Sequence, residues 1–101
     1  VVLLAAGGIY TEIYRDRSIR LAPVTLETAR EMISELAIVK TLQGFRGRPK
    51  GDLDAVAHAI VALSRLALDE EDDVADAEIN PLLVRREGEG VVALDALVRL
   101  V

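Results

Sequence analysis

The stretch VADAEINPLLVRREGEGVVALDALV, residues 74–98, decides the fold. Two largely apolar runs, 74–86 and 91–98, flank the glycine-containing sequence EGEG, and this pattern predicts an antiparallel hairpin. The Asn80-Pro81 pair interrupts the first run, because proline cannot donate to a strand ladder and asparagine is a poor strand former. This irregular point also carries the polar side chains of the strand, so it is the first place to look for a site.

The hairpin register brings candidate ligands together. If the turn centres on Glu87 and Gly88, Asn80 lies directly opposite Asp95, with Cβ atoms about 4.5–5.5 Å apart. Glu78 lies two residues from Asn80 on the same face of the strand. Two carboxylates and an amide oxygen suit Mg²⁺ or Mn²⁺ rather than zinc, and Mg²⁺ usually leaves positions for substrate phosphates. Spacing alone therefore indicates a metal–nucleotide site, although the acids of an open hairpin face can also be simply solvated.

The remainder of the chain supplies strands and two amphipathic helices. Thr25 and Asp52 are suitable caps for helices over 26–36 and 53–68, whose apolar residues recur at helical spacing. Ahead of them, glycines and polar residues separate three short apolar segments that we expect to be strands, at 1–6, 9–15 and 19–22, with a turn at RDRS, residues 15–18. We therefore expect an α+β fold, a mixed and mostly antiparallel sheet with two helices packed on one face.

Composition excludes several classes of protein. The 101 residues allow one domain, 51% of them are hydrophobic, and the net charge of −5 argues against a nucleic-acid surface. The chain has no cysteine, which excludes disulfides and thiolate metal sites and is compatible with the cytoplasm. No apolar run approaches the about 20 residues that span a membrane. Both ends lie in apolar runs, so we expect a single domain, residues 1–101, excerpted from a longer protein.

Three motifs resemble one family. GGIYTEIYRDRSIRLAPVT (7–25), LQGFRGRP (42–49) and AEINPLLV…GVVALDA (77–84 and 90–96) are similar, in order, to the C-terminal part of the ATP-grasp domain in ADP-forming (NDP-forming) acyl-CoA synthetases. Acetate–CoA ligase is the best-known activity there, and the succinyl-CoA synthetase β subunit is a more distant relative. The resemblance implies an enzyme that makes acyl-CoA from a carboxylic acid, CoA and ATP, with ADP and phosphate as the other products.

The resemblance also implies roles for individual residues. Asn80 and Asp95 match the family's Mg²⁺ ligands, with Glu78 beside them, and Glu12 matches an acid that faces the ATP/ADP cleft. Arg46 and Arg48 lie in a glycine-rich loop, where they either contact phosphate or belong to a solvated connector. No catalytic residue is assigned within this chain.

The partners that the family implies are the remaining ATP-grasp lobe and the CoA-binding and ligase domains, in one protein or complex, and an oligomer is compatible with it. We do not expect the 101 residues to turn over by themselves. An alternative is a non-catalytic regulatory or assembly module, for example one fused to an acetyltransferase domain.

Two other features of the sequence are not interpreted as functional sites. His58, in the middle of the second expected helix, is interpreted as an ordinary surface or helix-packing histidine. The acidic run DEEDD, residues 69–73, has nothing that converges on it and is not interpreted as a metal site.

Overall fold

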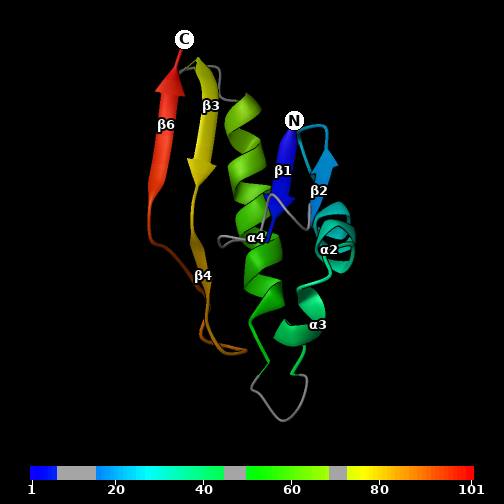
Figure 1. The fold of residues 1–101 in the computed structure, drawn as a ribbon. Coiled ribbons are helices and arrows are strands. Elements are labelled where there is room, and N and C mark those ends of the chain that lie inside the picture. Colours follow the sequence, from blue (N-terminus) through cyan, green and yellow to red (C-terminus); the bar gives the residue numbers. More distant parts are fainter. Residues whose placement is uncertain (7–15, 45–49, 69–72) are drawn as a thin grey trace.

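The computed structural model describes residues 1–6, 16–44, 50–68 and 73–101. Its elements in chain order are β1 (Val2–Ala5), β2 (Arg17–Arg20), α2 (Leu26–Ser34), α3 (Val39–Leu42), α4 (Leu53–Ser64), the 3₁₀ helix η2 (Arg65–Leu68), β3 (Val74–Ile79), β4 (Leu82–Val84), β5 (Val91–Ala93) and β6 (Ala96–Leu100). The described strands form three antiparallel two-stranded ladders, β1–β2, β3–β6 and β4–β5. The expected α+β class is confirmed (Figure 1).

Both long helices begin at the predicted caps. The Thr25 hydroxyl accepts from the N–H of Thr28 at 3.1 Å, and the Asp52 carboxylate accepts from the N–H of Ala55 at 3.1 Å. Both helices end earlier in the chain than predicted, because the α-helical hydrogen-bond pattern changes in the last turn. At the end of α2 the N–H of Glu35 is shared between the carbonyls of Glu31 and Met32, and α4 is followed directly by η2. No helix within the described ranges is long and apolar enough to cross a membrane.

The first ladder differs from the expectation by two residues. The returning strand is Arg17–Arg20 rather than 19–22, so the predicted turn at RDRS is wrong for Arg17 and Ser18. Ser18 is buried and donates to Glu35 at 3.1 Å, which draws it into the strand. Gly7-Gly8 and the expected strand 9–15 lie outside the described residues.

A short helix, α3, was not predicted. The carboxylate of Asp16 accepts from the N–H groups of Ala37 and Ile38, at 2.7 and 3.0 Å, just before α3 begins. This contact crosses from the end of the first ladder to the helical region, and local sequence patterns do not reveal it.

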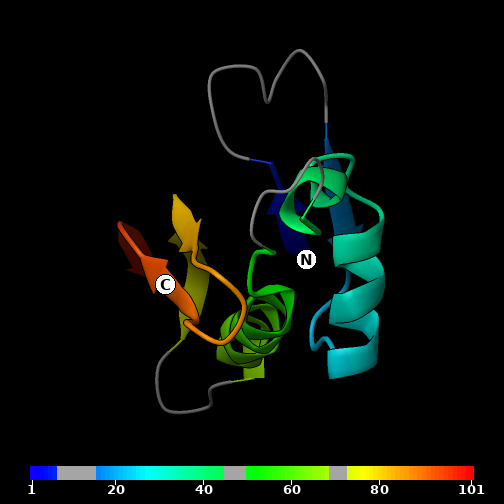
Figure 2. The same ribbon diagram turned by 90° about the horizontal axis from the view of Figure 1, so that it is seen from below.

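The core lies between α2 and α4, with β1 against them. Figure 2 shows α2 and α4 side by side, with the long hairpin on the far side of α4 from α2. The buried apolar residues are Val2, Val24, Ala29, Met32, Ile33, Leu36, Val39, Val56, Ala57 and Ile60. Among the described residues, Leu82, Val84 and Val91 in the tip half of the hairpin pack against this core.

Candidate metal–nucleotide site

The predicted hairpin register is confirmed. Glu78 pairs with Leu97 in one ladder and Leu82 pairs with Ala93 in the other, so the numbers of paired residues add up to 175 throughout β4–β5 and from Asp76 onward in β3–β6. The N–H of Glu89 donates to the carbonyl of Arg86 at 2.8 Å, which closes a turn centred on residues 87 and 88. Gly88 has a φ of +87°, a conformation that L residues rarely adopt.

The hairpin breaks at Asn80-Pro81, and both strands break at the same place. The N–H of Asn80 donates to the carbonyl of Asp95 at 2.9 Å, and the N–H of Leu94 donates to the carbonyl of Pro81 at 3.0 Å. Pro81 has no N–H to return, so the regular ladder cannot continue through it. The two strands that were predicted as continuous, 74–86 and 91–98, are each divided here, although their pairing order is unchanged.

The inward side of the hairpin changes at this break. In β3 the half-buried residues nearest the break are Ala77 and Ile79, whereas in β4 they are Leu82 and Val84. Alternate residues of a regular strand share a face, so the pattern shifts by one across the two consecutive exposed residues at the break. The break therefore presents Asn80 on the open surface while the strand on each side keeps its contact with the interior.

Regular strand alternation would place Ala75 on the same inward face as Ala77 and Ile79. Ala77 and Ile79 are half-buried, but Ala75 is exposed, because the β3–β6 ladder has an irregularity between Val74 and Asp76.

The three predicted ligands lie at or beside the break, and all are exposed. The amide nitrogen of Asn80 donates to the carboxylate of Glu78 at 3.2 Å. The amide oxygen of Asn80 takes no part in this hydrogen bond. Asp95 faces Asn80 across the ladder, and no described side chain donates to its carboxylate. The donor set is two carboxylates and an amide oxygen, which is the chemistry that Mg²⁺ prefers.

A nearby acid is already occupied. Asp76, on the same outer face of β3 as Glu78, accepts from the guanidinium of Arg99 at 2.8 and 2.5 Å. The hydrogen bond and charge of Asp76 raise the pKa of Arg99 above its ordinary value. The carboxylates near Asn80, those of Glu78 and Asp95, are therefore the ones on this side of the hairpin that are not paired with an arginine of the described ranges.

The candidate site is a surface rather than a cavity. The two best-formed hollows in the described residues, of about 370 and 460 Å³, lie beside Asp52 and beside Pro23, and neither includes Asn80 or Asp95. No group of three acidic, histidine or cysteine residues in the described ranges could hold a metal on its own. Any ion held at Asn80 and Asp95 must take further ligands from another molecule or from another part of the protein.

The remaining sequence candidates divide into two groups. Glu12, Arg46 and Arg48 lie outside the described residues. His58, in α4, is exposed and lies 3.6 Å from Asp54 of the same helix. The interpretation of His58 as an ordinary surface histidine agrees with this contact.

Sequence reasoning missed a second role of Asp52. Besides capping α4, its carboxylate accepts from the N–H groups of Gly88 and Gly90 in the hairpin turn, at 3.1 and 2.8 Å. The three N–H donors, of which Ala55 contributes most and Gly90 next, hold the pKa of this carboxyl below its ordinary value. The only local sign of this contact is the pair of glycines in the turn. Glycines do not show which residue they bind, and here the partner of Gly88 lies 36 residues away in the sequence.

Known proteins match this chain over almost its whole length. The ATP-grasp domain family matches residues 1–100. The β subunit of acetate–CoA ligase [ADP-forming] II from Pyrococcus furiosus is 35% identical over 98% of this chain, and the match covers 42% of that subunit. The chain therefore spans about two fifths of the length of this relative.

Solved structures share this fold. PH1788 from Pyrococcus horikoshii superimposes with a TM-score of 0.88 at 33% identity, covering 98% of this chain and 41% of that one. The dinucleotide-forming acetyl-coenzyme A synthetase 1 of Ca. Korarchaeum cryptofilum, in complex with coenzyme A and Mg-AMPPCP, gives a TM-score of 0.86 at 31% identity over 98% of this chain and 45% of that one. From the family match and the shared fold together, we conclude that this chain belongs to the ATP-grasp domain family.

Proposed function

We propose that this chain is the Mg–nucleotide-binding lobe of an ADP-forming acyl-CoA synthetase, which converts a carboxylic acid, CoA and ATP to acyl-CoA, ADP and phosphate. The observation that carries the proposal is the hairpin register, which sets Asn80 opposite Asp95 on an exposed surface in a chain of this family. The ADP-forming acetate–CoA ligase among its relatives supports the reaction class.

In this proposal Asn80 and Asp95 hold the metal. The amide oxygen of Asn80 and the carboxylate of Asp95 are its ligands, and Glu78 orients the Asn80 amide through the 3.2 Å hydrogen bond. A Mg²⁺ ion held there would neutralise charge on the nucleotide phosphates and orient them for transfer. Because Asn80 and Asp95 offer only two oxygen ligands, with Glu78 beside them, the remaining ligands would come from phosphates and water.

Other residues are proposed to complete the nucleotide site. Glu12 faces the nucleotide cleft, and Arg46 and Arg48 bind phosphate through their planar guanidinium groups. All three proposals rest on the motifs in the sequence, since these residues lie outside the described ranges.

The lobe acts with other parts of a protein or complex. The open surface at Asn80 and Asp95 requires a second ATP-grasp lobe to enclose the nucleotide, and CoA-binding and ligase domains supply the remaining chemistry. The Korarchaeum relative was crystallised with both coenzyme A and Mg-AMPPCP, which supports this arrangement. The regulatory-module alternative is not favoured, because two of the proteins reported above are named as an acetate–CoA ligase subunit and an acetyl-coenzyme A synthetase. A cytoplasmic location stays a prediction.

The test uses Asp95→Asn in the intact enzyme that carries this lobe. We expect the affinity for Mg–ADP, measured by calorimetry, to fall about tenfold or more, because one charged ligand is lost while the side-chain shape is kept. Thermal stability should change by less than about 0.5 kcal/mol, because Asp95 is exposed.

Asp73→Asn is the matched control, since Asp73 is an exposed aspartate at the far end of the same hairpin. It should leave Mg–ADP affinity unchanged. Equal Mg–ADP affinity in Asp95→Asn and in the unsubstituted enzyme would contradict the proposed ligand role, and a loss of stability without loss of affinity would assign Asp95 a structural role instead.

A further inference from the structure

The tip of the hairpin is tied to the start of α4. Figure 1 shows the turn between β4 and β5 beside the N-terminal end of this helix. At that point one oxygen of Asp52, Oδ2, accepts from the N–H of Gly88 at 3.1 Å and from the N–H of Gly90 at 2.8 Å. The other oxygen, Oδ1, accepts from the N–H of Ala55 at 3.1 Å and so caps the helix. The two oxygens therefore hold two different elements.

The glycines explain why the turn can accept this carboxylate. Gly88 and Gly90 have φ values of +87° and +83°, which aim their N–H groups at one point inside the turn. Backbone N–H groups that point toward one place make a small anion-binding concavity, and here Gly88 and Gly90, on either side of Glu89, supply them. Asp52 fills it from within the chain, and only 8% of the residue is exposed.

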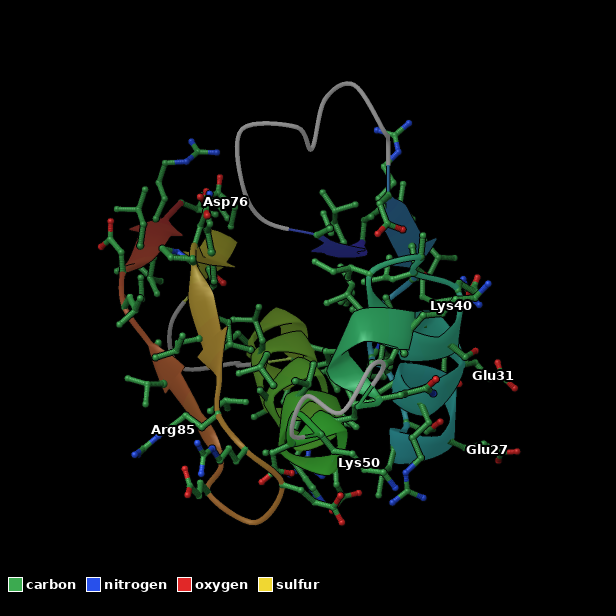
Figure 3. All side chains as sticks on the ribbon, turned by 60° about the horizontal axis from the view of Figure 1, so that its bottom comes forward. Glu27, Glu31, Lys40, Lys50, Asp76 and Arg85 are labelled. Atoms are coloured by element: carbon green, nitrogen blue, oxygen red, sulfur yellow. The ribbon has the colours of Figure 1, made fainter. Side chains whose placement is uncertain are left out.

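Backbone contacts reinforce this junction. The N–H of Asp52 donates to the carbonyl of Arg85, and the N–H of Glu87 donates to the carbonyl of Lys50, both at 2.8 Å. Gly51 also forms an antiparallel bridge with Arg86. In Figure 3 Lys50 and Arg85 lie toward one end of the molecule, and Asp76 lies at the opposite end of the hairpin. The segment that leads into α4 thus runs beside the hairpin tip and fixes it.

The hairpin needs such an anchor because few of its residues are buried. All five residues of β6 are exposed, and the side chain of Leu97, for example, belongs to a residue that is 63% exposed. A strand whose apolar residues are not packed against a core has a weakly specified register. A slip by one residue would move Asp95 away from Asn80 and turn its side chain to the opposite face.

We infer that Asp52 is a positioning residue for the metal site: by holding the N–H groups of Gly88 and Gly90 it fixes the turn, and the turn sets the register that places Asp95 opposite Asn80. This inference rests on the proposed function for its consequence in nucleotide binding. The structural part of the inference is that Asp52 stabilises the pairing of Asn80 with Asp95. It is independent of that function and can be measured separately.

The test is Asp52→Asn in the intact enzyme. Asparagine keeps one oxygen for the helix cap, but its NH₂ group cannot accept from the two glycine N–H groups. We expect amide hydrogen exchange to become about tenfold faster at Asn80 and Leu94 as well as at Gly88 and Gly90, the scale on which losing a charge-assisted hydrogen bond acts. The dissociation constant for Mg–ADP should rise about fivefold.

Exchange within α4 separates the anchor from the cap. If Asp52 acted only as a cap, Asp52→Asn would keep the cap and would leave exchange unchanged both across residues 55–58 and at Asn80 and Leu94, and that result would overturn the inference. Asp52→Ser provides a second variant, because serine caps helices well but has no second oxygen. Wild-type exchange at Asn80 and Leu94 in this variant would also overturn it.

Asp54→Asn is the matched control for an aspartate at the same helix start. Asp54 is exposed and pairs with Arg30 at 2.9 Å, without a contact to the turn, so hairpin exchange should stay at the wild-type rate. If Asp52→Asn speeds exchange at Asn80 while Asp95→Asn leaves Mg–ADP binding unchanged, the anchor is supported and the proposed metal role fails. The two ideas therefore fail separately.

Discussion

The helical pair and the hairpin are stabilised in different ways. Between α2 and α4, Ala29, Met32 and Ala57 are fully buried, and the contact is a close-packed apolar core. The outer half of the hairpin has no fully buried residue and holds its shape through ladder hydrogen bonds, the Asp76–Arg99 pair and the anchor at its tip. The proposed ligands lie on the less buried element, so the part that carries the site is not the part that carries most of the stability.

The largest expected effect is a cavity in the helical pair. Met32→Ala should lower the free energy of unfolding by about 2–5 kcal/mol, because a fully buried side chain is removed and the space is only partly refilled. Urea unfolding of the purified chain, followed by circular dichroism, measures this. Leu97→Ala in β6 is the comparison, and at 63% exposure it should cost no more than about 0.5 kcal/mol. Equal losses would show that the hairpin is packed as firmly as the helices.

A polar contact inside the helical region should give an intermediate effect. The hydroxyl of buried Ser64 accepts from the N–H of Val24 at 3.1 Å and donates to the carbonyl of Val61 at 2.8 Å. Ser64→Ala leaves the buried N–H of Val24 without an acceptor and should cost about 1–3 kcal/mol. The midpoint of urea unfolding should fall while the slope stays the same.

Ser34→Ala is the control for that variant. Ser34 is exposed, and its hydroxyl donates only to the carbonyl of Glu31 at 2.7 Å. Because alanine also favours the helix, the change should be within about 0.5 kcal/mol of zero. A loss as large as that of Ser64→Ala would mean that burial does not decide the cost of these hydroxyl contacts.

The smallest expected effect is the response to acid. The pKa of Asp52 is lowered by the N–H groups of Ala55 and Gly90, and that of Glu35 by its hydrogen bond from Arg20. A carboxyl whose pKa is lower in the folded state contributes stability above its unfolded pKa, about 4, and loses it as the pH falls through the folded value. Thermal stability should therefore fall below about pH 4.

The same titration distinguishes the two regions. The Tm of Asp52→Asn should fall less between pH 5 and pH 3 than the Tm of the unsubstituted chain, because one of the two shifted carboxyls is gone. In the unsubstituted chain, the protection of Gly88 and Gly90 against exchange, taken relative to the intrinsic rate at each pH, should fall in acid before that of residues inside α2 does, since Met32 and Ala29 carry no charge. If α2 opened first, the anchor would not be the acid-sensitive part.

Local patterns predicted the caps at Thr25 and Asp52, the helical faces and the hairpin register, because each depends on neighbours along the chain or on turn length. They placed the returning strand β2 two residues late and missed α3, because Ser18 and Asp16 are held by contacts with Glu35 and Ala37 that are distant in sequence. The division of the hairpin at Asn80-Pro81 was only half visible: proline marks the break in one strand, but nothing in the sequence of the other strand marks the break beside Asp95.

The same contrast applies to the site. Register predicted that Asn80 and Asp95 face each other, since this depends on counting from the turn. It could not show that Glu78 bonds to the Asn80 amide or that Asp52 holds the turn, because both depend on side-chain conformations and packing.

The simultaneous break in both strands has an evolutionary consequence. Asn80 and Asp95 stay opposite each other only while equal numbers of residues separate each from the turn. A single insertion in one strand would separate them, whereas insertions in the turn, or matched ones in both strands, would not. Length variation among relatives should therefore fall in the turn or occur as paired changes, and related sequences can be compared for this pattern without any measurement on the protein.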